Sequence, residues 1–375
     1  MYALLFVDHG MSAGQISSLF ALWSVTAFTL EVPSGALADR VSRRRLLALA
    51  MVLRGIGFGL WVGAPSYLSF AVGFMLWGAG SAMASGTEQA LVYDGLAALG
   101  HPAAYPGLMG RAGTARLLGN AAGTLAAAPL VALGGYPLAG WLSVAVCLAA
   151  AAVAWSFPEA PRVEAVGEGG YLATLRAGVR EAATHRVVRS VVLLAALLSG
   201  LWVIDEYLPL LAGSDGASVA AVPLLLLPMV LGQAAGSALA GRCARLRPVA
   251  LAGVLAAGAA LLALGALVRH PAGFLPIAVA MGALSLGNVL VDARLQDSIE
   301  GSARATVTSV AGFGAEVVAV LLFGAYGLGA AAGLDGAELV AAFAVPLGLL
   351  AVATPRWLPR ACHRRPAATE HARVG

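Results

Sequence analysis

The sequence predicts an all-α protein that crosses a membrane many times, and three observations support this fold class. Hydrophobic residues make up 60% of the 375 residues and charged residues 11%, a composition that cannot cover a soluble globule of this size with polar surface. The apolar residues form runs of about 20, which is the helix length that spans a bilayer core. Arginines gather at the ends of these runs, as they do in the cytoplasmic loops of membrane proteins.

The charge and the cysteine content argue against other classes of protein. The formal net charge of +4 comes from arginine, because the sequence contains no lysine. These arginines form no solvated basic stripe with interleaved aromatic residues, so we expect no nucleic-acid partner. The three cysteines are scattered over an apolar run, an arginine-rich loop and the C-terminal region, and they suggest neither a disulfide nor a metal site. The chain has no nucleotide-binding loop, and we expect no cofactor.

Eleven apolar runs are expected to be membrane spans, and a shorter run precedes them. Residues 1–7 are apolar but reach only about a third of the length that a span requires, so we expect an incomplete first helix, caused by a late start codon or by truncation. Counting this short run as the first span, the eleven expected spans are the second to the twelfth, at residues 15–38, 46–62, 67–92, 108–133, 138–157, 187–211, 219–240, 249–268, 274–295, 305–330 and 339–353.

The longest break in hydropathy divides these spans into two groups. Residues 158–186 are rich in glutamate and arginine and are predicted to be a central cytoplasmic loop. The pattern A-L-A-x-R-x-x-R-x-R at residues 36–45 recurs at 238–247, which indicates duplication of a six-helix unit. We therefore predict four parts: an N-terminal bundle at 1–157, the loop at 158–186, a C-terminal bundle at 187–354 and a cytoplasmic tail at 355–375.

The stretch at residues 34–45 places four arginines and an aspartate between the first two full spans, which indicates a cytoplasmic turn. It resembles motif A of the major facilitator superfamily, G-x-L-x-D-R-x-G-R-R-R, with Ser42 in place of the last glycine. The matching residues are Gly35, Leu37, Asp39, Arg40, Arg43, Arg44 and Arg45.

This resemblance implies two pseudo-symmetric six-helix bundles that rock about a central cavity. It also implies a cytoplasmic gate, in which Asp39 faces the start of the eleventh span near residues 302–306 and Arg43 bridges Asp39 to Asp94. Such contacts would bias the rocking equilibrium without touching substrate. The alternative is that these charges serve only as signals for topology.

Ionisable side chains inside apolar runs are costly unless paired or hydrated, so each is a candidate site. The inner part of the first bundle holds the carboxylates Glu31 and Glu88 and the arginines Arg54, Arg111 and Arg116. We expect these charges to pair and hold helices together, or else to handle protons or substrate. Glu31, which lies close to Pro33, is the first choice for proton exchange.

The second bundle contributes three more candidates. Asp205 and Glu206 interrupt the seventh span, and adjacent carboxylates on a helix cannot face one direction, so we expect at least one to meet the cavity. The alternative is that both lie at the outer interface. Glu316 interrupts the eleventh span after two glycines, so it either lines the path or marks close helix packing.

The resemblance implies proton-linked export of a small, fairly apolar molecule from a bacterial inner (plasma) membrane by a monomeric carrier. Residues 119–123 resemble the antiporter motif gxxxGPxxGG, although Thr124 replaces its proline. A uniporter or importer of a small metabolite is the first alternative, and a transport-dead fragment or interaction subunit is the second. An enzyme is not expected, because all six histidines lie outside the predicted spans.

Overall fold

The computed structural model describes residues 2–38, 41–85, 87–101, 104–158, 186–298 and 304–359, and all regular structure in these ranges is helical. Most of the predicted central loop and tail, at 159–185 and 360–375, lies outside the described residues, as do Asp39 and Arg40. The α-helices are α1 (Tyr2–Asp8), α2 (Ala13–Ala38), α3 (Arg43–Gly63), α4 (Tyr67–Ala84), α5 (Thr87–Ala98), α6 (Tyr105–Ser156), α8 (Arg186–Gly200), α9 (Ile204–Ser214), α10 (Val222–Ala240), α11 (Pro248–Leu267), α12 (Phe274–Ser298), α13 (Arg304–Ala331), α14 (Gly336–Ala342) and α15 (Ala344–Trp357).

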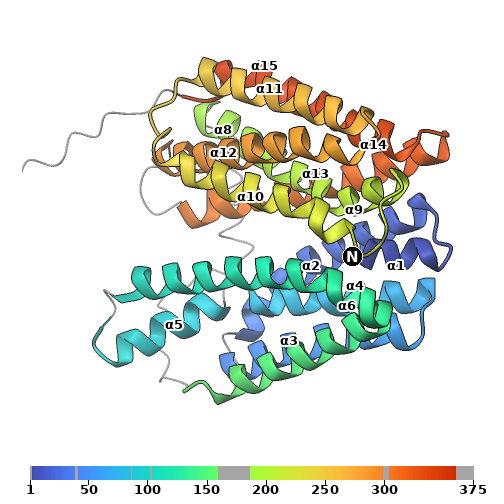
Figure 1. Cartoon of the computed structure of the whole chain (residues 1–375). Helices are drawn as coiled ribbons and strands as arrows, with labels where there is room; N and C mark the ends of the chain where they lie inside the picture. The colour runs from blue at the N-terminus through green and yellow to red at the C-terminus, as the bar shows by residue number, and fades with distance from the viewer. Residues whose placement is uncertain are drawn as a thin grey trace, which may run out of the picture.

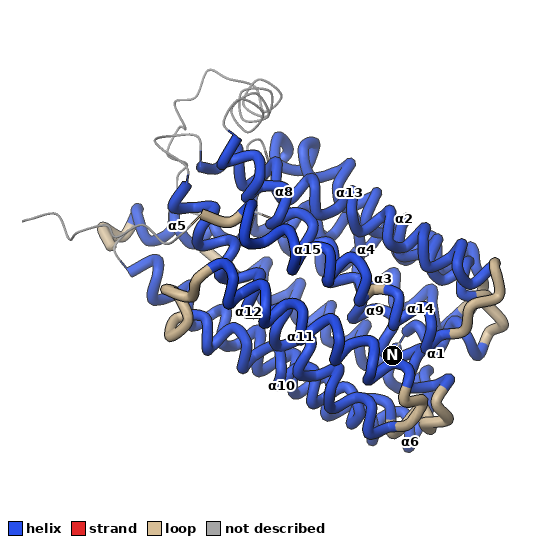
Figure 2. Tube along the Cα trace, turned by 90° about the horizontal axis from the view of Figure 1, so that it is seen from above, coloured by secondary structure: helices blue, strands red, loops and turns tan. Residues whose placement is uncertain are grey.

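The helices run side by side along a common direction, and the described turns gather at the two ends of the molecule (Figures 1 and 2). Ten helical segments in the described part of the chain are long and apolar enough to span a membrane. Figure 1 shows α3 to α6 on one side of the molecule and α10, α11, α12 and α15 on the other. The predicted all-α polytopic fold class is therefore confirmed.

Helix α6 contains two of the predicted spans. Its backbone leaves the helical conformation at Gly135, where φ is 63° and ψ is −161°, a region of backbone space that is open essentially only to glycine. Figure 1 shows the chain reversing its direction between the two legs of α6. The break lies between the predicted spans at 108–133 and 138–157.

The seventh span is also interrupted, and this interruption positions the candidate carboxylates. Helix α8 ends at Gly200, a 3₁₀ turn covers Leu201–Val203, and α9 begins at Ile204. Asp205 and Glu206 therefore lie in the first turn of α9.

Small residues allow α10 and α12 to pack with their backbones in contact. A Cβ atom built on Gly232 would lie 2.2 Å from the carbonyl oxygen of Ala278, and one on Gly236 would lie 2.1 Å from that of Gly282. No side chain fits at such distances, so these glycines are required for the close approach of the two helices.

In the described part of the chain, the most extensive contacts between the two halves are those of α2 with α13, α6 with α10, and α1 with α9. The short helix α1 is held by a buried aromatic cluster, in which the ring centroid of Phe6 lies 4.3 Å from that of Phe70 and 5.5 Å from that of Trp61. Aromatic pairs at such separations add to the stabilisation that burial alone provides. The α1 backbone is thereby fixed beside α9.

Candidate functional site

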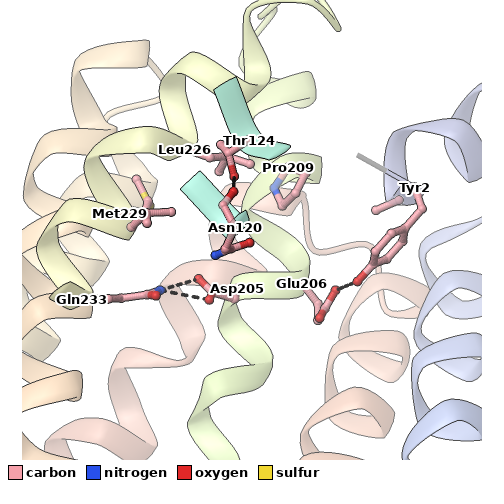
Figure 3. A pocket seen from close by; sticks show the side chains of 11 residues that line it. Tyr2, Asn120, Thr124, Asp205, Glu206, Pro209, Leu226, Met229 and Gln233 are labelled. Carbon is pink, nitrogen blue, oxygen red and sulfur yellow. Dashed lines mark hydrogen bonds between the residues drawn. The ribbon is translucent and has the colours of Figure 1, made fainter. Parts of the chain in front are cut away.

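A cavity of about 230 Å³ lies where the two halves of the chain meet. Its wall combines α1 and α6 from the first half with α9 and α10 from the second (Figure 3). The lining residues are Tyr2, Ala3, Asn120, Thr124, Asp205, Glu206, Pro209, Leu226, Met229, Val230 and Gln233.

Asp205 is held by a single neutral partner among the described residues. The side-chain nitrogen of Gln233 donates to both carboxylate oxygens, over 3.0 Å and 2.9 Å. Gln233 lies on α10, so this contact fixes the first turn of α9 against the neighbouring helix of the same half. An amide donor supports a carboxylate by hydrogen bonding but leaves its charge uncompensated.

Glu206 points in a different direction from Asp205, because adjacent residues on an α-helix are about 100° apart around its axis. It accepts a hydrogen bond from the hydroxyl of Tyr2 on α1, and Figure 3 shows the two side chains meeting across the cavity. This contact joins the two halves of the chain at the cavity itself. Both carboxylates thus line the cavity, one toward α10 and the other toward α1.

The opposite wall is formed by α6. Asn120 and Thr124 lie one turn apart and face the cavity together, and the hydroxyl of Thr124 donates to the backbone oxygen of Asn120 over 2.9 Å. Arg116 lies one further turn along the same face but is not a lining residue, and its side chain is exposed. The described lining therefore combines two carboxylates and neutral polar groups with apolar side chains and contains no cationic side chain.

A second acidic contact lies between α2 and α13. The buried hydroxyl of Ser24 donates to the carboxylate of Glu316. Glu31 lies about two turns beyond Ser24 on α2, and its carboxylate accepts a long 3.4 Å hydrogen bond from Ser85. Neither glutamate lines the cavity that contains Asp205.

The motif A region lies at the end of the molecule where α2 meets α3. Gly35 and Leu37 belong to the last turn of α2, and Ser42 caps α3 by accepting from the backbone nitrogen of Arg45 over 3.4 Å. Arg43 forms an ion pair with Asp94 on α5 and donates to the backbone oxygen of Ala90 over 3.2 Å. The expected contact between Arg43 and Asp94 is therefore present, whereas the contacts of Asp39 and Arg40 fall outside the described residues.

The expected pairing of charges within the first bundle is wrong for the described residues. Glu31, Glu88, Arg111 and Arg116 have exposed side chains, and the described part of the chain contains no ion pair among them. Arg54 instead donates to the hydroxyl of Ser81 over 3.1 Å. The sequence shows that these charges lie in neighbouring spans, but it does not show on which side of each helix they lie. Glu88 and Arg116 also lie outside the lining of the cavity.

Three hydrogen-bond partners of the candidate carboxylates were missed by reasoning from the sequence. Tyr2, Gln233 and Ser24 bind the predicted carboxylates, but they carry no charge and therefore give no signal within apolar runs. Arg294 was also missed, although a charge in the tenth span was a visible signal. It is buried and donates to the backbone oxygens of Ala244, Leu246 and Pro359 over 2.8 to 3.2 Å.

Comparison with known families decides the class of protein. The family model described as Major Facilitator Superfamily matches residues 1–322. The chain belongs to the major facilitator superfamily. It is therefore a multi-pass membrane transporter and not an enzyme.

Solved structures show the same fold at low sequence identity, whereas no curated protein shows significant sequence similarity to this transporter. The nucleoside transporter NupG is 12% identical, with a TM-score of 0.71 over 95% of this chain and 93% of that one. A D-xylose–proton symporter is 15% identical, with a TM-score of 0.69 over 95% and 91%. A bacterial homologue of the human lysosomal transporter Spinster is 16% identical, with a TM-score of 0.64 over 95% and 92%.

Proposed function

We propose that this transporter is a secondary active carrier that works by alternating access and couples substrate movement to protons at Asp205 and Glu206. The observation that carries the proposal is the cavity itself, in which both carboxylates meet at the junction of the two halves. Rocking of the halves changes the access to a site in this position, whereas a site inside one bundle would keep its exposure.

The carboxylates have the properties that proton coupling requires. An ionised carboxylate inside a membrane is costly in free energy unless it is paired or hydrated. The protonation of Asp205 and Glu206 therefore depends on whether water or substrate occupies the cavity. Glu206 is bonded to Tyr2 of the other half, which links its protonation to the contact between the halves. Glu31 and Glu316 are proposed as a secondary proton site, because Glu316 is bonded to Ser24 on α2, the helix that carries Glu31.

We propose efflux of a small, fairly apolar molecule as the direction of transport. Leu226, Met229 and Val230 give the cavity an apolar wall. The antiporter-like stretch at 119–123 lies on α6, where Asn120 faces the cavity. Import by proton symport is the second candidate, and it is favoured by the fold match to a D-xylose–proton symporter.

The inner gate is proposed to include Arg43 and Asp94, which join the start of α3 to α5. Asp39 and Arg40 complete this gate by their place in motif A. We also propose that the two moving bodies are residues 1–157 and 187–354, with 158–186 as the loop between them and 355–375 as a tail. We propose that the transporter is a monomer in the bacterial plasma membrane.

Proteoliposomes that contain a pH-sensitive dye test the proposal and the direction together. When a transported solute is added outside, an antiporter moves protons out as solute enters, so the lumen becomes alkaline. A symporter makes the lumen acidic, and a uniporter leaves its pH unchanged. Asp205→Asn and Glu206→Gln should abolish the dye response, whereas Asp215→Asn, a matched change beyond the end of α9, should keep it. Unchanged responses in both cavity variants would overturn the coupling site.

A further inference from the structure

The chemistry of the cavity indicates what kind of molecule it binds. We propose that its ligands are small amphiphilic organic cations, whose positive group binds Asp205 and whose apolar body packs against α10. This inference rests on the proposed function, because it specifies the substrate class of the same site.

The first argument is the charge of the cavity. Asp205 receives both of its described hydrogen bonds from one neutral amide, that of Gln233, and no described lining residue is cationic. A carboxylate inside a membrane is stabilised by an opposite charge much more than by a neutral donor. A cationic ligand supplies that charge when it enters, and a neutral or anionic ligand does not.

The second argument is the balance of hydrogen-bond donors and acceptors. The hydroxyl hydrogen of Tyr2 is donated to Glu206 and that of Thr124 to the backbone of α6, while each carboxylate offers about four acceptor sites. Among the described lining side chains, the amide of Asn120 is the remaining source of free donors, so free acceptors outnumber free donors. Ammonium and amidinium groups carry only donors, whereas a sugar hydroxyl is donor and acceptor in equal measure.

The third argument is the arrangement of the apolar wall. Leu226, Met229 and Val230 lie on the same helix as Gln233, so the apolar surface begins beside the amide that holds Asp205. Methionine adapts to ligands of different shape. A molecule with a charged group at one end and an aromatic or aliphatic body matches this arrangement, whereas a compact inorganic cation leaves the apolar wall uncovered.

Three probes of nearly equal size and shape separate charge from fit: benzamidine, which is cationic at neutral pH, neutral benzamide and anionic benzoate. Their binding is measured by calorimetry on the purified full chain in nanodiscs of zwitterionic lipid, with D-xylose as a neutral polyol. Benzamidine should bind about tenfold or more tightly than benzamide, as expected when a charge-assisted hydrogen bond replaces a neutral one. Benzoate and D-xylose should bind more weakly still.

Asp205→Asn should remove the preference for benzamidine over benzamide, and Asp215→Asn should retain it. Equal affinities in the unmodified protein, tighter binding of D-xylose, or an undiminished preference in Asp205→Asn would each overturn the inference. The comparison within the unmodified protein decides the question even if the variant fails to fold. Binding is measured without a proton gradient, so the two proposals can fail separately. Cation binding without proton-linked transport would refute the proposed coupling alone. Proton-linked transport of D-xylose without cation binding would refute the inference about the substrate alone.

Discussion

The hydroxyl of Ser24 on α2 donates a hydrogen bond to the carboxylate of Glu316 on α13, and the two residues belong to opposite halves of the chain. The serine is buried and the contact as a whole is partly buried. The junction between the halves therefore contains a polar contact within an apolar interface.

Removal of the Ser24 hydroxyl should destabilise the junction. Ser24→Ala removes the hydroxyl that donates to the partly buried Glu316 carboxylate, and a hydrogen bond typically contributes about 0.5–1.5 kcal/mol to stability. The melting temperature of the purified protein in detergent should fall. Ser143→Ala is the matched control, because Ser143 donates to Ala139 within its own helix. Equal melting temperatures for the two variants would show that the Ser24 contact contributes nothing to stability.

Loss of the ion pair between Arg43 and Asp94 should slow transport while leaving insertion intact. Asp94→Asn keeps the shape of the side chain but removes a charge-assisted hydrogen bond worth about 1.5–3 kcal/mol. The transport rate at equal expression should drop several-fold or more. Asp297→Asn, an exposed change at the end of α12, should transport normally. A wild-type rate in Asp94→Asn would leave Arg43 as an orientation signal only.

We expect Arg294 to be essential for the stability of the second bundle at the C-terminal end of α12. Its guanidinium group binds three backbone oxygens in two separate segments. Lysine has no planar fork, so Arg294→Lys should lower the melting temperature and Arg294→Gln should lower it further. The exposed Arg356 offers the control Arg356→Gln, for which we expect no shift. Full stability of Arg294→Lys would contradict a role for the fork geometry.

Asp335 should make a small, pH-dependent contribution to the stability of the turn before α14. Its pKa lies below the ordinary 3.8, chiefly because the backbone nitrogen of Glu338 donates to its carboxylate, with Arg269 as a further partner. A lowered pKa in the folded state means that the stabilisation is complete above about pH 4 and is lost as the pH falls through the lowered pKa.

Melting curves of wild type and Asp335→Asn at several pH values measure this contribution. The difference between them should stay constant above about pH 4 and shrink at lower pH, and added salt should reduce it because the pair with Arg269 is exposed. A difference that grows as the pH falls would contradict the direction of the shift.

The spans could be predicted from the sequence because length and hydropathy are local properties. The two legs of α6 and the break near Gly135 follow from two apolar runs separated by a glycine pair, and the ends of α13 lie within one residue of the predicted span. Pairing between helices is not a local property. Tyr2 and Glu206 are 204 residues apart in the chain, and nothing in their neighbouring residues indicates this contact.

The position of the carboxylates could be predicted only in part. Asp205 and Glu206 were visible as charges in an apolar run, but their partners depend on how α9 is rotated against α1 and α10. The expected pairing of Glu31 with nearby arginines failed for the same reason, since charge gives no information about helix rotation. The ion pair of Arg43 with Asp94 was predictable because the resemblance to motif A implies a contact between these two residues.

The backbone contact between α10 and α12 has a consequence for how the sequence can vary. On α10, Leu231 has 61% of its surface exposed. Its side chain can therefore face lipid, and many other apolar side chains can take its place. Its neighbour Gly232 has no room for a single methyl group. Two adjacent codons should therefore accept very different numbers of substitutions, and a saturation library selected for folded protein should tolerate change at the first and reject it at the second.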